Sequence, residues 1–233
     1  MADKITVLII DDSVFMRKLL SDLLESDARI KVVGTARNGK EGLEKIKELK
    51  PRVATLDYEM PGWNGIKTLQ HIMKERPTAV VMLSAYTEKD ADISLQALKE
   101  GAVDYVLKPS GPVSWDIEQV KHEIIEKVRA ASLVNIAKFN ELLQKKSERL
   151  AFRREIPLLD QVVVMGASTG GPQTLELILK QFPQNIPVAF LIVQHMPKVF
   201  TKMFADRLDL IMNIKVKEAE QGEIIKKGIA YVA

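Results

Sequence analysis

Short apolar runs alternate with longer segments of helical periodicity along the first part of the chain. Residues 7–10 and 80–83 are apolar at every position, which is typical of strands covered on both faces in a parallel sheet. Segments 14–26 and 65–75 instead repeat apolar residues at helical spacing. This strand and helix unit recurs five times. The pattern therefore predicts a doubly wound α/β domain with a five-stranded parallel sheet over residues 1–133.

A second strand and helix pattern begins after Pro157. Apolar strand-like runs at 160–167 and 187–195 are each followed by a helical segment, and two short strand-like runs lie around Gly222 and Gly228. The pattern predicts a second α/β domain with a parallel sheet over residues 156–233. Residues 134–155 have helical periodicity but no strand partner, which indicates a helical linker. Its basic residues could bind an acidic partner, although a solvated helix is the ordinary meaning of such a charge run.

Composition narrows the class of protein. No apolar run among the 233 residues is long enough for a membrane span, and the N-terminus enters a strand without a signal-peptide pattern, so we expect a cytoplasmic protein without membrane insertion. Cysteine is absent, which excludes disulfides and thiolate chemistry. The net charge of +3 comes from residues 134–155, and the segments on either side are nearly balanced. Nucleic-acid binding is therefore not expected.

Polar residues gather where the predicted strands of the first domain end. Because the carboxyl ends of parallel strands meet at one sheet edge, we expect these side chains to share a crevice. Three carboxylates there would repel one another without a cation, and an all-oxygen set favours Mg²⁺. The residues are Asp11, Asp12, Asp57, Ser84 and Lys108.

Asp57 is the candidate phosphoryl acceptor in this crevice. A metal and a lysine beside a carboxylate would neutralise the charge that builds on transferred oxygens. Each residue also has a plainer interpretation: Asp11 or Asp12 could cap the next helix, and Lys108, which precedes Pro109, could lie on the surface. Because all of these side chains are predicted at one sheet edge, we favour the interpretation that they form a metal-binding and phosphoryl-accepting site.

The motifs "LIIDDS", "TLDYEMPGWNG", "MLSAY" and "DYVLKPS" resemble the flavodoxin-like receiver domain of response regulators, over residues 4–131. The resemblance implies phosphorylation of Asp57 by a histidine kinase. It implies Mg²⁺ held by Asp12, Asp57 and the backbone of Glu59, with Asp11 alongside. Ser84 and Lys108 would contact the phosphoryl oxygens, and the Tyr105 ring would follow Ser84. Asn64 replaces an aspartate frequent in that loop, and we expect little effect.

The stretch "GASTGG", residues 166–171, follows the first strand of the second domain. It fits G-x-S-x-G, in which a sharp turn lifts a serine above a sheet and aims backbone N–H groups at an oxyanion. It also fits a glycine-rich loop that binds an anion at a helix N-terminus, although it lacks the G-K-[ST] of a P-loop. On the loop alone, Ser168 is either a nucleophile or part of an anion cradle.

His195 favours the nucleophile. It closes the next predicted strand and so lies at the same edge as Ser168 if the two strands are parallel. A capping or core histidine is the alternative, which suits His71 and His122 within their helical patterns. A serine and a histidine at neighbouring strand ends indicate nucleophile and base. The order and spacing of Ser168 and His195 do not match the α/β-hydrolase fold, so a different hydrolase fold is indicated.

The motifs "GASTGGP", "QHMP", "FTKMFADRL" and "VKEAEQGE" behind a receiver resemble the CheB family of chemotaxis protein-glutamate methylesterases. The resemblance implies hydrolysis of glutamate methyl esters on chemoreceptors, and deamidation of receptor glutamines, by Ser168 with His195. It places Thr169 in the active site. A monomer with methylated chemoreceptors and the chemotaxis histidine kinase as partners is expected, with no cofactor for the esterase.

The family's third catalytic residue is an aspartate well downstream of the histidine, and the printed sequence ends at Ala233. We therefore expect an incomplete second domain, an exposed sheet edge and impaired hydrolysis. Glu218, Glu220 and Glu223 resemble a surface turn and are not assigned to a triad. The alternative function is a phosphorylation switch whose second region only binds a partner. A transcription factor is less favoured, since residues 156–233 show no helix-turn-helix pattern.

Overall fold

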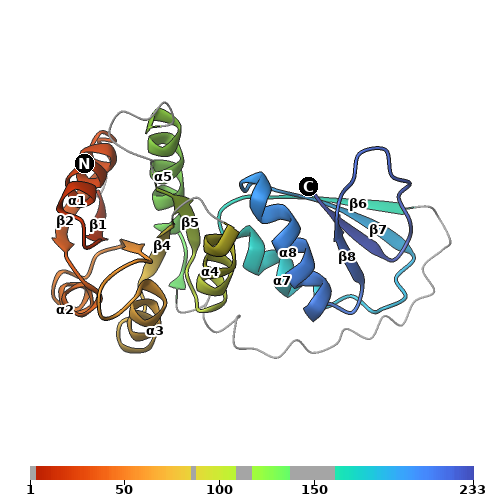
Figure 1. Cartoon of the computed structure of the whole chain (residues 1–233), viewed down its shortest axis with the longest axis horizontal. Coiled ribbons are helices and arrows are strands. Elements are labelled where there is room, and N and C mark those ends of the chain that lie inside the picture. Colours follow the sequence, from red (N-terminus) through yellow and green to blue (C-terminus); the bar gives the residue numbers. More distant parts are fainter. Residues whose placement is uncertain (1–3, 85–87, 109–116, 137–160) are drawn as a thin grey trace. The chain divides into compact units, whose positions relative to one another are not determined.

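The computed structural model describes residues 4–84, 88–108, 117–136 and 161–233, and Figure 1 shows its helices and strands. The chain divides into two compact units, Met1–Leu142 and Leu143–Ala233. The linker helix predicted for residues 134–155 lies almost entirely outside the described residues, so it stays a prediction, as do the domain boundaries. Among the described helices, none has the length and apolar character needed to cross a bilayer.

The first unit is built on a five-stranded parallel sheet in the order β2-β1-β3-β4-β5 (Figure 1). This order is that of a doubly wound sheet, so the predicted fold is confirmed. The carboxyl ends of β1 and β3 lie side by side at the point where the winding reverses. The strands are β1 (Ile5–Ile10), β2 (Ile30–Ala36), β3 (Val53–Asp57), β4 (Ala79–Ser84) and β5 (Asp104–Leu107).

Five helices follow the five strands and cover both faces of this sheet. Helix α1 packs against α5, and α2 packs against α3. Val7, Leu24 and Ile124 are fully buried in the core between the sheet and the α1–α5 pair. The helices are α1 (Val14–Glu25), α2 (Gly39–Leu49), α3 (Gly65–Glu75), α4 (Glu88–Lys99) and α5 (Ile117–Ala131).

Side-chain caps fix where three of these helices begin. Ser13, Asn38 and Asn64 each accept a hydrogen bond from the main-chain N–H three residues later, at 3.2, 3.0 and 2.9 Å respectively. Such a cap contributes about 1 kcal/mol. Because Ser13 caps α1, the alternative that Asp11 or Asp12 caps this helix is wrong. Asn64 caps α3, a role that the aspartate frequent at this position would fill equally well.

The second unit contains a four-stranded parallel sheet in the order β6-β7-β9-β8 (Figure 1). The predicted second α/β domain with a parallel sheet is thus confirmed over the described residues. Helix α7 (Gly171–Leu179) follows the first strand and α8 (Lys198–Ile211) follows the second. The strands are β6 (Gln161–Ala167), β7 (Val188–Gln194), β8 (Lys215–Glu218) and β9 (Ile229–Val232).

The two faces of this second sheet differ in burial. Phe190 of β7 is fully buried, as are Phe200 and Phe204 of α8. On the opposite face Val164 of β6 is 68% exposed and Val193 of β7 is 55% exposed. Within residues 161–233, β6 and β8 are the two edge strands. The sheet therefore presents apolar side chains on one face near its β6 edge.

Glu218 corrects one sequence expectation. The sequence pattern predicts a surface turn at this residue, but Glu218 is the last residue of β8 and is half-buried. Its carboxylate accepts a hydrogen bond from the Thr201 hydroxyl of α8. The run 215–218 holds a single apolar residue, Val216, among three charged ones, so its pairing with β9 could not be foreseen from the sequence.

Glu176 links α7 to α8 and gives the second unit a predicted pH dependence. Its carboxylate binds Lys180, the C-cap residue of α7, and Arg207 of α8, the latter at 3.1 Å. Burial alone would raise the pKa of the Glu176 carboxyl, but Lys180 and Arg207 outweigh burial and hold the pKa below its usual 4.5. The stabilisation is therefore present above pH 4.5 and is lost as the pH falls through the folded-state pKa.

We expect Glu176→Gln to lower the unfolding free energy of this unit by about 1 kcal/mol at pH 7 and by much less at pH 3. Urea unfolding of the whole chain at the two pH values measures the difference. Asp206→Asn, which removes an exposed carboxylate that pairs with Lys202, is the matched control and should change little. An equal loss at pH 7 and pH 3 would contradict the prediction.

Candidate functional site

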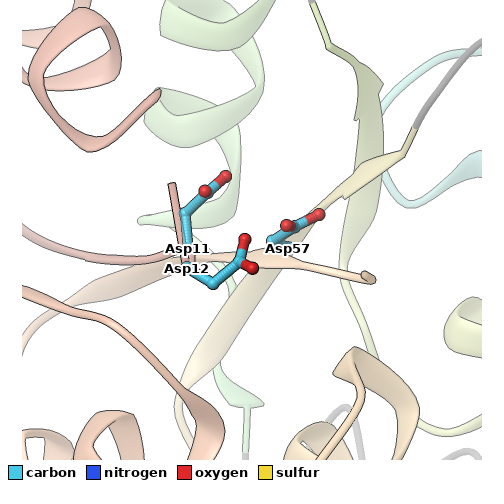
Figure 2. A group of neighbouring side chains, drawn as sticks. All are labelled: Asp11, Asp12 and Asp57. Carbon is cyan, nitrogen blue, oxygen red and sulfur yellow. The ribbon is translucent and has the colours of Figure 1, made fainter. Parts of the chain in front are cut away.

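Three carboxylates converge at the carboxyl end of the first sheet. Asp11 and Asp12 directly follow β1, and Asp57 is the last residue of β3. One oxygen from each lies within 4.8 Å of the others, and Figure 2 shows the three side chains gathered at this edge. Asp11 and Asp57 are buried, whereas Asp12 is exposed. The cluster predicted from strand ends is present and could hold a metal ion.

Lys108, the residue after β5, contacts two carboxylates of this cluster. Its ammonium lies 2.7 Å from the Asp57 carboxylate and 3.2 Å from that of Asp11. The side chain is only 21% exposed, so the alternative that Lys108 is an ordinary surface lysine is wrong. The single Lys108 ammonium thus contacts two carboxylates, so with Asp12 the cluster has more carboxylates than cations and a net negative charge.

The Asp57 carboxylate has one satisfied and one open oxygen. Oδ1 accepts the Glu59 main-chain N–H at 3.2 Å, whereas Oδ2 is buried without a hydrogen-bond partner among the described residues. A buried carboxylate oxygen without a partner costs free energy unless a cation or a donor binds it. This orphaned oxygen, within an all-oxygen donor set, fits a hard divalent cation.

Burial and charge shift the titration of this pair. Burial raises the pKa of Asp57 from 3.8 to about 6, with Lys108 opposing the rise and Asp11 adding to it. Burial would lower the pKa of Lys108, but Asp57 and Asp11 outweigh burial and raise it. The ammonium therefore stays charged at neutral pH, beside a carboxylate that is costly to ionise in the absence of a cation.

Ser84 and Tyr105 lie on the neighbouring strands. Ser84 ends β4 and is buried, and its carbonyl accepts the Lys108 main-chain N–H at 2.8 Å. The Tyr105 ring of β5 is buried, with the Lys127 ammonium 4.9 Å from its centroid. Sequence reasoning missed Lys127, because its position on α5 carries no motif.

Gly65, the first residue of α3, brings this helix against the backbone of Asp57. A Cβ at this position would lie 2.6 Å from the Asp57 carbonyl oxygen and 2.7 Å from the Cα of Tyr58. The Gly65 N–H also donates to the Tyr58 carbonyl at 2.8 Å. Only glycine allows this approach, so it fixes the loop after β3 and with it the position of Asp57.

In the second unit, Ser168 lies in the turn between β6 and α7. The Gly171 N–H donates to the Ser168 carbonyl at 2.7 Å, which closes the turn. Gly170 has a φ of 71°, a left-handed conformation that favours glycine. Ser168 is exposed and Thr169 beside it is half-buried. The turn thus presents the serine hydroxyl at the carboxyl edge of the sheet.

His195 lies beside this serine. Strands β6 and β7 are parallel and pair Ala167 with Gln194, so the next residue of each strand reaches the same edge. The His195 N–H donates to the Ala167 carbonyl at 2.8 Å. The Ser168 Oγ lies 3.3 Å from His195 Nδ1. This separation is slightly longer than a tight hydrogen bond, as is common for catalytic pairs without substrate.

The other two histidines lie within helices of the first unit, as predicted, but neither is a core or capping histidine, because His71 is half-buried and His122 is exposed. His71 of α3 contacts Glu75 at 2.9 Å and stacks on Trp63 with ring centroids 4.1 Å apart. His122 of α5 lies 3.6 Å from Glu126.

Two family models match the chain. A response regulator receiver domain matches residues 7–115, and CheB methylesterase matches residues 163–233. The "Protein-glutamate methylesterase/protein-glutamine glutaminase" of Geobacillus kaustophilus is 49% identical over 98% of the chain and 66% of its own length. The protein of the same description from Halalkalibacterium halodurans is 46% identical over 100% and 67%. The chain thus spans about two thirds of the length of these curated relatives.

A solved structure resembles the first unit. The response regulator domain of Thermotoga maritima CheB is 49% identical, with a TM-score of 0.53, over 57% of this chain and 98% of that one. Almost all of that domain is matched, so the first unit corresponds to one complete receiver domain.

Proposed function

The chain belongs to the CheB methylesterase family with an N-terminal receiver domain, and from this membership we propose that it is a phosphorylation-regulated protein-glutamate methylesterase and protein-glutamine glutaminase. The observation that carries the proposal is the contact between Ser168 Oγ and His195 Nδ1 at neighbouring strand ends. A module that only binds a partner has no need of this contact, so the switch without catalysis is not favoured.

In the proposed reaction, Ser168 Oγ attacks the carbonyl carbon of a glutamate methyl ester while His195 takes its proton. His195 then gives the proton to the departing methanol, and water cleaves the acyl-serine to release the free glutamate. We assign stabilisation of the oxyanion to main-chain N–H groups of the turn around Ser168. We assign Thr169, the next residue along the chain, to the same active site. With a receptor glutamine as substrate, ammonia leaves in place of methanol.

The acidic cluster supports phosphorylation of Asp57 by the chemotaxis histidine kinase. We assign Mg²⁺ to Asp12, Asp57 and the Glu59 carbonyl, with Asp11 alongside; bound there, the ion would neutralise charge on the transferred phosphoryl group. Lys108 is placed to bind a phosphoryl oxygen, since it already lies 2.7 Å from Asp57. We assign Ser84 to another oxygen, with Tyr105 following its movement.

From the order of the two domains we infer that the unphosphorylated receiver restrains the Ser168 edge and that phosphorylation shifts the population toward a freed form. The expected substrates are methylated chemoreceptors, and the expected setting is the cytoplasm, with a monomeric chain. The aspartate that would orient His195 is not assigned within residues 1–233, so the expected rate is below that of a full-length relative.

The test measures methanol release from a methylated chemoreceptor fragment by this chain and by a full-length relative, each with and without a small phosphodonor. We expect slow release by this chain and a faster rate with the relative, up to about 10⁴-fold. An organophosphonate, which labels activated serines, should modify Ser168. If this chain showed neither methanol release nor labelling of Ser168, the proposal would be overturned. A rate equal to the relative's would contradict only the expected impairment.

A further inference from the structure

Gln194, the last residue of β7, bridges the two turns that carry the reacting side chains. It is 5% exposed, and its side-chain amide donates to the Ser168 carbonyl at 3.0 Å and to the His195 carbonyl at 3.2 Å. A primary amide has two N–H bonds. Here one group can therefore hold both the serine's and the histidine's main chain.

The chemistry of the two carbonyls fixes the direction of this amide. The reverse orientation would place the amide oxygen against two carbonyl oxygens, which is repulsive, so the nitrogen must face them. Oε1 then points toward the start of α7, where it is buried and has no hydrogen-bond partner among the described residues. A buried oxygen left unpaired opposes folding, so the arrangement is poorly explained by stability alone.

Gly171 makes room for this side chain. A Cβ there would lie 2.0 Å from the Gln194 Oε1 and 2.9 Å from the Cβ of Ala167. The second glycine of the "GG" pair therefore accommodates Gln194, whereas the first, Gly170, supplies the left-handed turn. The serine loop and the glutamine fit one another.

The strands themselves do not depend on this amide. β6 and β7 pair over seven residues from Gln161 to Ala167, and the His195 N–H continues the ladder to Ala167. The Gln194 side chain instead holds carbonyls just beyond the last strand residues. The hydrogen bonds of the Gln194 amide thus act just past the end of the ladder. There they hold the main chain that sets the separation between Ser168 and His195.

We propose that Gln194 is a positioning residue that holds the Ser168 turn and the His195 backbone at a fixed separation through its single side-chain amide. Its catalytic meaning rests on the proposed function. Loss of the amide should let the two turns move apart, while the substrate surface and the sheet remain. Because small misplacements of reacting groups cost about 10²-fold in rate, the effect should appear in kcat.

The test compares Gln194→Met, which keeps the length without donors, and Gln194→Glu, which keeps the shape but turns oxygen toward both carbonyls. Gln181→Met is the matched control, because Gln181 in the same unit also donates to a main-chain carbonyl, that of Leu177, away from both turns. In the whole chain, we expect both Gln194 variants to lower kcat for methanol release about 10- to 100-fold with KM within about twofold.

Backbone hydrogen exchange supplies a readout independent of activity. Exchange at the Gly171 and His195 amides, which donate to the Ser168 and Ala167 carbonyls, should quicken about tenfold or more in Gln194→Met, with residues 163–165 of β6 unchanged. Unchanged kcat, a change confined to KM, or faster exchange throughout the second unit would each overturn the positioning role. If the wild-type chain neither releases methanol nor reacts with a phosphonate, the proposed function fails, and local exchange alone decides whether Gln194 holds the two turns.

Discussion

Ser168→Ala is expected to reduce methanol release from a methylated receptor fragment by about 10³-fold or more relative to the unmodified chain. The reason is that the hydroxyl beside His195 is the proposed nucleophile, and alanine offers no atom to form the acyl intermediate. The same substitution should abolish labelling by an organophosphonate, which mass spectrometry of the intact chain measures directly.

Ser21→Ala is the matched control for this result. Its hydroxyl bonds the Arg17 carbonyl on α1 of the first unit, so removing it should leave both readouts unchanged. Substantial methanol release by Ser168→Ala would show that another residue is the nucleophile. The glycine-rich turn would then be interpreted as an anion-binding loop. Thermal unfolding of each variant establishes that the second unit is still folded.

Asp57→Asn is expected to reduce phosphoryl uptake from a small phosphodonor below detection, because an amide is not a nucleophile for phosphoryl transfer. The substitution also removes one of the three carboxylates of the acidic cluster and the charge that Lys108 contacts at 2.7 Å. Mass spectrometry at neutral pH with Mg²⁺ detects the added phosphoryl group. The stimulation of methanol release by the phosphodonor should disappear with it.

Asp22→Asn provides the control for charge alone, since Asp22 lies on the exposed surface of α1 and pairs with Lys18. It should accept phosphate at position 57 as the unmodified chain does. If Asp57→Asn still gained one phosphoryl group and still responded to the donor, the acceptor would be another side chain, and the assignment of the acidic cluster would be wrong.

The first unit could be predicted well because its signals are local. Asp57 ends a strand, and Asp11 and Lys108 each directly follow one, so the edge shared by parallel strands brings them together as expected. The sequence could not determine which of several neighbouring polar residues caps a helix, because that depends on the residue at which the helix begins. Ser13 rather than Asp12 caps α1 because the helix begins at Val14, and sequence patterns place such boundaries only within a few residues.

The second unit was harder to predict in detail. The proximity of Ser168 and His195 followed from two parallel strands, but the nitrogen that faces the serine, Nδ1, depends on a ring rotation that no pattern encodes. Gln194 was missed because a glutamine ending a strand carries no chemical signal of its own. The nearest clue was the "GG" pair after Ser168, whose second member is explained only by the side chain that packs against it.

The pairing of Ala167 with Gln194 has a consequence for how this unit can tolerate change. The loop between α7 and β7 can change in length without altering the distance between Ser168 and His195, provided that β6 and β7 keep their alignment. A slip of one residue in either strand would instead turn alternate side chains to the opposite face. Length variation in this loop should therefore be tolerated, whereas a single insertion within β7 should be as damaging as deleting the histidine.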